Sequence, residues 1–234
     1  MPNILGVITA RGKSKGIPHK NIKILGDKPL IAYTIEVAKN SELITHLITS
    51  TDDREIAEIA KKYGCNVPFL RPKELGRDDT PTLSVLQHAT TFMEKKLGIK
   101  FDYLVILQPT SPFRIVEDID KTIQLLIDTP EADSAVSICE VEKNHHPMKA
   151  KRLEGNRVLP YCIEEPEGSR RQDYPVCYKR SAAVYVQKRD LVMKKNRLYG
   201  DYIVGHIVPR ERSIDIDTEY DWLRAEYMLK NKKC

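Results

Sequence analysis

Short apolar runs alternate along the chain with longer stretches in which apolar residues recur at helical spacing. Apolar runs bounded by turn residues are typical of buried strands. Such runs occur at Ile4–Ile8, Leu47–Thr49, Tyr103–Leu107 and Ala135–Ile138. Strands that alternate with amphipathic helices predict an α/β fold, with a mainly parallel sheet that helices cover on both faces.

The expected helices begin at recognisable starting residues. Pro29 opens a helix over Leu30–Lys39, since proline costs no hydrogen bond in the first turn. Asp52 and Glu55 form an Asp-x-x-Glu start for the next helix. Helical spacing also marks residues 83–97, Ile119–Ile127 and a last helix that Thr218 and Asp221 would cap.

The alternation breaks between about residues 139 and 180. Prolines at positions 147, 160, 166 and 175 lie here, with a cluster of charges and only short apolar pieces. We interpret the chain as a single domain over residues 1–234 with an inserted arm or subdomain at 139–180. Such an insertion is either a lid or an element that contacts a partner.

Composition limits the function without defining it. The net charge of +5 arises from 38 basic and 33 acidic residues that are well interspersed, which argues against nucleic acid as a partner. The sequence has no apolar run of about 18 residues, so we expect no membrane-spanning helix. The first strand begins close to Met1, which predicts no signal peptide. Widely spaced cysteines without a C-x-x-C pair predict reduced thiols and a cytoplasmic location.

Cations crowd the loop that follows the first expected strand, at residues 9–21. They are Arg11, Lys13, Lys15 and Lys20, with glycines at 12 and 16 between them. Glycines let a backbone approach a ligand closely and expose its N–H groups. Since neighbouring cations repel one another, we expect an anion among them, and the phosphates of a nucleoside triphosphate suit that arrangement. A solvated basic loop without a ligand is the alternative.

Two nucleotide-binding motifs match this loop poorly. A P-loop needs four residues between its glycines and runs directly into a helix. Val7 stands where that motif needs glycine, and Pro18 would interrupt the second helical turn. The loop also lacks Gly-x-Gly-x-x-Gly, which argues against a dinucleotide-binding dehydrogenase.

Two carboxylates share one face just before the last expected helix. Alternate side chains of an extended segment point the same way, so Asp215 and Asp217 should lie together. A divalent cation would relieve their repulsion, and Mg²⁺ prefers one or two carboxylates together with phosphate oxygens and water. A surface strand end followed by the Thr218 cap is the alternative.

Two further groups are candidates for substrate recognition. Gln108 directly follows the strand Tyr103–Leu107, and ligands of open α/β sheets bind beyond the carboxyl ends of strands. In the insert, Lys149 and Arg171 could hold a substrate carboxylate, which a guanidinium matches bidentately. A solvated turn or a charged surface is the alternative for these residues.

Several motifs occur in one order along the chain. They are Ala-Arg-x-x-Ser-Lys-Gly-Ile-Pro-x-Lys-Asn at 10–21, Ser-Thr-Asp-Asp at 50–53, Arg-Pro-x-Glu-Leu at 71–75, Leu-Gln-Pro-Thr-Ser-Pro-Phe-Arg at 107–114, His-His-Pro-Met-Lys at 145–149 and Asp-Ile-Asp-Thr at 215–218. With these motifs the chain resembles the CMP-sialic acid synthetases, or acylneuraminate cytidylyltransferases, from about residue 3 to residue 230. The resemblance implies a Rossmann-like nucleotidyltransferase fold and a homodimer formed through the inserted arm.

The resemblance also implies an enzyme that uses CTP and Mg²⁺ to activate an acidic nonulosonic sugar, with the CMP-sugar and diphosphate as products. A nucleotidyltransferase for another acidic sugar or for a non-sugar acid stays open, as does a non-catalytic nucleotide-binding protein. The acceptor of the sugar's hydroxyl proton is either a metal-bound water or one of the two aspartates.

Site residues follow from the resemblance position by position. The residues implied to hold the triphosphate are Arg11, Ser14, Lys15 and Lys20, and those near the nucleoside are Asn21 and Arg71. Asp215 and Asp217 would bind the metal, and the sugar acid would meet Gln108, Lys149, Arg171 and Thr82. Catalysis would depend on the cations at 11, 15 and 20 and on both aspartates.

One segment departs from the family pattern. Where Asn-Gly usually precedes an alanine, this chain has Ser181-Ala182. We therefore expect altered hydrogen bonds and an altered shape close to the sugar pocket. This change favours a related nonulosonic acid, such as a diamino-dideoxy form, over N-acetylneuraminate.

Overall fold

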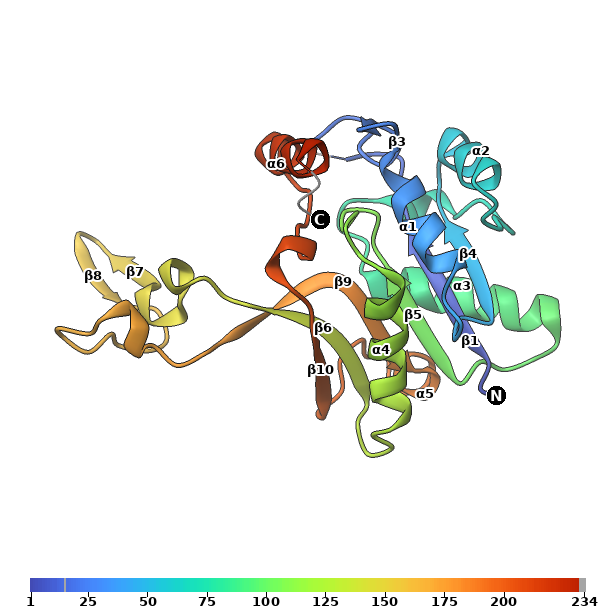
Figure 1. Cartoon of the computed structure of the whole chain (residues 1–234). Helices are drawn as coiled ribbons and strands as arrows, with labels where there is room; N and C mark the ends of the chain where they lie inside the picture. Colours follow the sequence, from blue (N-terminus) through green and yellow to red (C-terminus); the bar gives the residue numbers. More distant parts are fainter. Residues whose placement is uncertain (15, 232–234) are drawn as a thin grey trace.

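A computed structural model describes residues 1–14 and 16–231 as a six-stranded sheet covered by helices, with a projecting arm (Figure 1). The strands, in the spatial order β10-β6-β9-β5-β1-β4, are β10 (Ile203–Ile207), β6 (Ser134–Glu140), β9 (Tyr178–Lys188), β5 (Tyr103–Leu107), β1 (Ile4–Thr9) and β4 (His46–Ser50). β1 is parallel to β4 and β5, and β10 is parallel to β6, whereas β9 runs antiparallel to β5 and β6. The predicted α/β fold with a mainly parallel sheet is confirmed.

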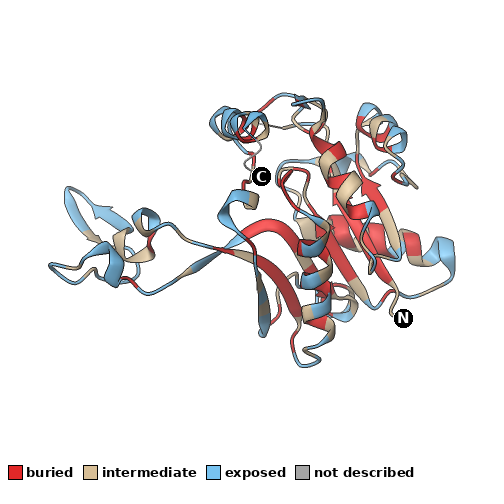
Figure 2. Cartoon of the chain, in the orientation of Figure 1, coloured by how far each residue is buried: buried red, intermediate tan, exposed pale blue. Residues whose placement is uncertain are grey.

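Helices pack on both faces of this sheet. They are α1 (Leu30–Lys39), α2 (Arg54–Lys62), α3 (Thr82–Leu97), α4 (Val116–Ile127) and α5 (Arg189–Met193). The last helix, α6 (Glu219–Lys230), packs away from the sheet in a separate apolar cluster. α1, α2 and α4 share a core with Ile4 and Ile8 of β1, whereas α3 and α5 share one with Leu5 and Val7. Both faces of β1 are therefore buried, as Figure 2 shows, and this explains its continuous apolar sequence. Each helix among the described residues is too short or too polar to cross a membrane.

A third apolar cluster joins the two ends of the chain. Trp222 of α6 packs in it with Ile17 of the basic loop and with Ile214 and Ile216. The short ribbon of β2 (Ile24–Leu25) and β3 (Lys28–Pro29) supplies the neighbouring Leu25. This cluster holds the basic loop against the segment that contains the aspartate pair.

The two predicted helix caps differ in outcome. Thr218 caps α6 as expected, since its hydroxyl accepts a hydrogen bond of 3.2 Å from the amide of Asp221. The start expected at Asp52 is wrong, because Asp53 caps α2 with hydrogen bonds from two amides of the first turn. The Asp52 carboxylate instead accepts a hydrogen bond of 3.0 Å from the amide of Gly12 in the basic loop.

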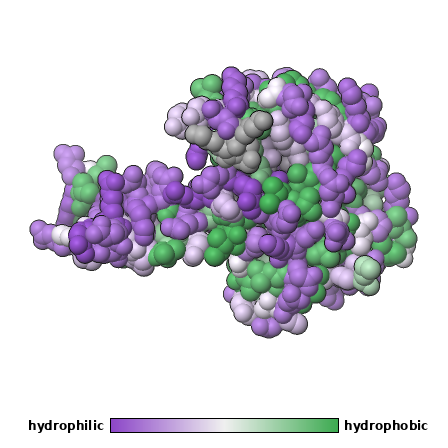
Figure 3. Space-filling view, viewed as in Figure 1, coloured by the Kyte–Doolittle hydropathy of each residue, from purple (hydrophilic) through white to green (hydrophobic). Residues whose placement is uncertain are grey.

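Residues 141–177 form the arm, which leaves the sheet between β6 and β9 (Figure 1). Its elements are η2 (Lys143–His145), η3 (Pro147–Lys149), the hairpin of β7 (Lys151–Glu154) and β8 (Arg157–Pro160), and η4 (Arg171–Asp173). Large apolar side chains are exposed on it, among them Leu153, Val158, Tyr161, Ile163 and Val176. Figure 3 shows apolar residues on the arm surface among many hydrophilic ones.

Candidate active site

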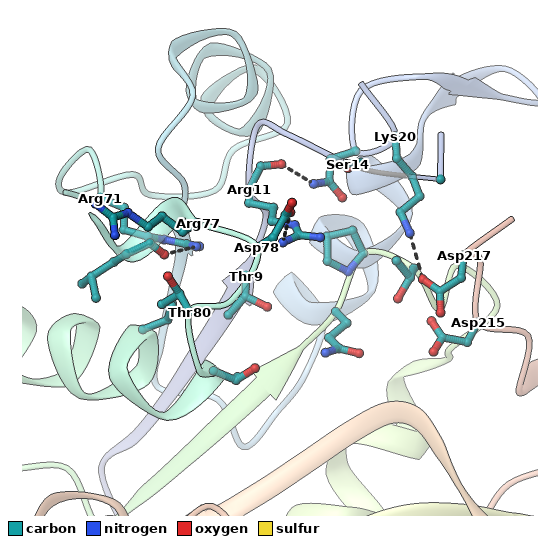
Figure 4. Close-up of a pocket in the computed structure, with 18 residues that line it drawn as sticks. Thr9, Arg11, Ser14, Lys20, Arg71, Arg77, Asp78, Thr80, Asp215 and Asp217 are labelled. Atoms are coloured by element: carbon teal, nitrogen blue, oxygen red, sulfur yellow. Dashed lines mark hydrogen bonds and ion pairs between the residues drawn. The ribbon is translucent and has the colours of Figure 1, made fainter. Parts of the chain in front are cut away.

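A cavity of about 490 Å³ opens beyond the carboxyl ends of β1 and β5 (Figure 4). The segments that line it are the basic loop after β1, residues 71–85, the loop after β5 and residues 215–217. Asp215 and Asp217 lie on one side of the cavity, and Arg71 and Arg77 lie on the other. This is the place at which open α/β sheets bind their ligands.

Most of the residues assigned from the sequence meet here. Those that line the cavity are Arg11, Ser14, Lys20, Asn21, Arg71, Thr82, Gln108, Asp215 and Asp217. Lys15 lies outside the described residues. Among the residues that the structure describes, neither Lys149 nor Arg171 contributes to this lining, because β6 and β9 carry the arm away from the sheet (Figure 1).

Lys20 connects the basic loop to the aspartate pair. Its Nζ donates to the carbonyl oxygen of Ile216 at 2.6 Å and to Oδ1 of Asp217 at 3.0 Å. Gly16 lies against the same segment, since an added Cβ would stand 2.2 Å from the carbonyl oxygen of Asp217. Close approach of these two backbones therefore requires glycine at position 16.

Asp215 is the buried member of the aspartate pair. Within the described part of the chain, its Oδ1 is buried and has no hydrogen-bond partner. Burial raises the pKa of Asp215 above its usual range, and the charge of Asp217 adds to the shift, whereas Thr110 and Lys20 oppose it. An unpartnered carboxylate oxygen beside a second carboxylate suits a divalent cation with few protein ligands, such as Mg²⁺. The described residues contain no cluster of three or more His, Cys, Asp or Glu that could enclose a metal by itself.

Hydrogen bonds to the backbone fix the start of the basic loop. The amide nitrogen Nδ2 of buried Asn21 donates to the carbonyl oxygen of Arg11 at 2.8 Å. The Gly12 amide donates to Asp52 on the other side, as described above. Asn21 therefore shapes the loop that holds Arg11, in addition to lining the cavity.

Arg71 organises the segment that faces the basic loop. Its Nε donates to the hydroxyl of Ser50 at 3.1 Å, its Nη2 donates to the Ser50 carbonyl, and its Nη1 donates to the carbonyl of Leu75 at 3.3 Å. Burial lowers the pKa of Arg71 to about 10, while Asp52 raises it and Arg11 lowers it. The guanidinium is therefore charged at neutral pH and secures the chain that leads to Arg77.

Sequence reasoning missed three polar lining residues in this segment: Arg77, Asp78 and Thr80. Asp78 forms an ion pair of 2.6 Å with Arg11, and both side chains are more than one-third exposed. The signal that could have indicated them is their position directly after the Arg-Pro-x-Glu-Leu motif, which Arg71 ties to the end of β4.

The remaining predicted residues lie away from the cavity. Lys149 stands in the arm with its Nζ 5.6 Å from the centre of the Tyr174 ring, and Arg171 is exposed in η4. Ser181 is buried with its hydroxyl 2.7 Å from that of Ser137. Among the described residues, Ser181 and Ala182 do not line the cavity, so the structure does not support their expected direct effect on its shape.

Comparison with known proteins finds relatives over nearly the whole chain. A family model described as cytidylyltransferase matches residues 5–222. The CMP-N,N'-diacetyllegionaminic acid synthase of Campylobacter jejuni is 33% identical over 232 residues, which cover 99% of this chain and 97% of that protein. The N-acylneuraminate cytidylyltransferase of Escherichia coli is 31% identical over 221 residues, which cover 94% of this chain and 50% of that protein.

A solved structure shares the fold at lower identity. A CMP:2-keto-3-deoxy-manno-octonic acid synthetase complexed with CTP superposes with a TM-score of 0.75 at 16% identity, covering 98% of this chain and 99% of that chain. The nucleotidyltransferase fold implied by the sequence resemblance is thereby confirmed. Because the family model matches most of the chain and a relative above 30% identity aligns over nearly its full length, the chain belongs to the cytidylyltransferase family.

Proposed function

We propose that this enzyme transfers the cytidylyl group of CTP to the anomeric hydroxyl of an acidic nonulosonic sugar and releases diphosphate. The observation that carries the proposal is the contact between the basic loop and the aspartate pair, made by Lys20 within one cavity. Phosphate-binding cations and metal-binding carboxylates must meet for this reaction, because it consists mainly of positioning and charge stabilisation. The substrate class is supported by similar proteins, which include two synthases that activate acidic sugars.

The cations of the basic loop are proposed to hold the triphosphate. Arg11 and Lys20 line the cavity with the Ser14 hydroxyl, and Lys15 is proposed to join them. Asn21 and Arg71 are proposed to lie near the nucleoside. In this arrangement Arg11 exchanges its half-exposed ion pair with Asp78 for a charge-assisted hydrogen bond to phosphate.

Mg²⁺ is the proposed cofactor, and Asp215 and Asp217 would hold it. Bound there, the ion would neutralise negative charge on the phosphates of CTP. In the reaction, the anomeric oxygen attacks the α-phosphorus, the bond from the α-phosphorus to the bridging oxygen breaks, and diphosphate leaves with that oxygen. The hydroxyl proton passes to a carboxylate oxygen of the aspartate pair or to a water molecule beside it.

We further propose a homodimer in which the arm completes the site of the partner. A two-stranded hairpin such as β7–β8 is only marginally stable in isolation. The exposed apolar side chains on the arm are typical of a surface that contacts another protein. Lys149 and Arg171 are far from their own cavity, so their proposed contact with the sugar carboxylate requires a second copy of the chain. A cytoplasmic location is part of this proposal.

The test is diphosphate release from CTP in the presence of Mg²⁺ and each of several acidic sugars. We expect turnover with a nonulosonic acid, with a preference for a form that carries two acylated amino groups over N-acetylneuraminate. ATP, GTP and UTP should be poor substitutes. Equal turnover with UTP or ATP, or activity only with an acid outside this sugar class, would contradict the proposal.

A further inference from the structure

β9 contains a large bulge where the β6–β9 ribbon that leads to the arm separates from β5. Val136 of β6 pairs with Tyr185, but Ile138 pairs with Arg180, so Ser137 alone lies opposite residues 181–184. β9 pairs with both β5 and β6 from Gln187 to Tyr185, and beyond the bulge it pairs with β6 alone. Bulges of this kind end regular pairing and often lie next to active sites.

Hydroxyl groups hold the bulge to β6. The Ser137 Oγ accepts hydrogen bonds from the amide of Val184 at 2.8 Å and from the Ser181 hydroxyl at 2.7 Å, and donates to the Val184 carbonyl at 3.2 Å. Between them, Ala182 has a φ of 59°, in the left-handed region that side chains with a Cβ rarely adopt. The surrounding bonds therefore maintain a strained backbone at this position.

Arg114 holds the same bulge from the side of the active-site cavity. Its side chain is 2% exposed, and its Nε donates to the carbonyl of Ala183 at 2.6 Å. Its Nη2 donates to the carbonyl of Gln108 at 2.8 Å, and its Nη1 donates to the hydroxyl of Thr34 at 2.9 Å. Within residues 1–14 and 16–231, no carboxylate forms an ion pair with it. The described hydrogen-bond partners of Arg114 are neutral, and the carboxylates of Asp118 and Asp215 act on it only through their charges. Burial of a guanidinium in this arrangement is costly, so stability alone does not account for it.

We propose that Arg114 is a positioning residue that keeps Gln108 of the cavity and the base of the arm in one fixed relation. Its guanidinium donates to the carbonyl of Gln108 in the cavity lining and to the carbonyl of Ala183 in the bulge, two residues that are far apart in the sequence. Because the β6–β9 ribbon continues from this bulge to the arm, the direction of the arm relative to the cavity depends on these bonds. The effect on sugar use rests on the proposed function, whereas the structural connection does not.

The test compares R114K and R114M with the wild type. Lysine keeps the charge but cannot form the planar set of bonds, and methionine removes the charge at similar length. In both variants we expect the amides of residues 178–184 to exchange hydrogen faster, on the order of tenfold, because local opening sets their rate. The KM for the sugar should rise on the order of tenfold, while the Kd of CTP changes less than about twofold.

R189M is the matched control. Arg189 forms a bidentate ion pair of 2.6 and 2.8 Å with Glu94, which joins α5 to α3 away from both the cavity and the bulge. R189M should lower the melting temperature and leave the exchange of residues 178–184 and the sugar KM unchanged. Wild-type exchange in R114M, or the same local change in R189M, would overturn the proposal.

S137A keeps the test decisive should the Arg114 variants fail to fold. Alanine removes the hydroxyl that holds the bulge to β6 and touches no residue of the cavity lining. Faster exchange at 178–184 with a higher sugar KM supports the connection, and faster exchange with an unchanged KM overturns it. A wild-type enzyme that accepts no acidic sugar refutes the proposed function, and the exchange in R114K and R114M still decides the structural connection.

Discussion

Replacing Gly16 with alanine tests the contact between the basic loop and the aspartate segment most directly. The added Cβ would lie 2.2 Å from the carbonyl oxygen of Asp217, and real Cβ atoms do not approach closer than 3.0 Å, so the two segments must separate by at least 3.0 − 2.2 = 0.8 Å. That shift would move Asp217 away from Lys20 and weaken their 3.0 Å hydrogen bond. A displacement of about 1 Å at a catalytic site can reduce the rate on the order of 100-fold.

The fold should tolerate this substitution. Gly16 is exposed and its φ is not in the left-handed region, so alanine imposes no backbone strain there. Loss of glycine also lowers the entropy of the unfolded chain, by roughly 0.4–1 kcal/mol in favour of the folded state. We therefore expect G16A to lose about 100-fold in kcat/KM with a melting temperature close to that of the wild type.

The assay is diphosphate release over a range of CTP concentrations, which gives kcat/KM, repeated at several Mg²⁺ concentrations and accompanied by a melting curve for each protein. G155A is the control, because Gly155 lies in the hairpin turn of the arm and an added Cβ there meets no atom within 4 Å. G155A should be less stable, since its φ of 59° is left-handed, and should keep the wild-type response to Mg²⁺. Normal activity in G16A would show that the loop and the aspartates need not touch.

Further substitutions test the single groups of the cavity. R11A should lose roughly 10- to 100-fold in kcat/KM without unfolding, because a hydrogen bond to a charged group contributes about 1.5–3 kcal/mol; K13A, in the same loop but outside the lining, is its control in steady-state kinetics. D215N should abolish Mg²⁺-dependent turnover and yet raise the melting temperature at neutral pH. Because the pKa of Asp215 is raised in the folded state, the stability of the wild type falls as the pH rises above the ordinary aspartate pKa of about 3.9. The gain in melting temperature of D215N should therefore vanish below that pH, and an equal gain at pH 3 would contradict this reasoning. Light scattering should give a dimer of the 26.8 kDa chain, and a monomer at micromolar concentration would refute the proposed role of the arm.

The central part of the fold could be predicted from the sequence because burial on both faces leaves an unbroken apolar run. β1 and β5 are of this kind, and their predicted ranges match the structure to within one residue. β10 escaped prediction because its residues alternate between half-buried and exposed positions at the edge of the sheet. β9 escaped because its first residues are exposed and polar and lie within the interpreted insert.

In the site, too, features set by local spacing could be predicted, and features set by tertiary packing could not. Asp215 and Asp217 could be predicted, because a two-residue spacing fixes the shared face of an extended segment. Their contact with Lys20 could not, since it depends on packing of Ile17 against Ile216 around α6. The position of Lys149 and Arg171 outside the cavity depends on the bulge in β9, and its strained residue is an alanine, which carries no sequence signal for a left-handed φ.

Three groups that violate ordinary rules of stability lie around the cavity and the base of the arm. Asp215 buries an oxygen that has no partner among the described residues, Arg114 is a buried cation held by neutral groups, and Ala182 has a left-handed φ. Such exceptions persist where surrounding packing enforces them and where function needs them. Arg114 bonds to the residue next to Ala182, and the charges of Asp118 and, to a smaller extent, Asp215 stabilise its cation. Under the proposed function, all three lie in or near the place where phosphates, a cation and a carboxylate substrate would meet, and stability alone does not account for them.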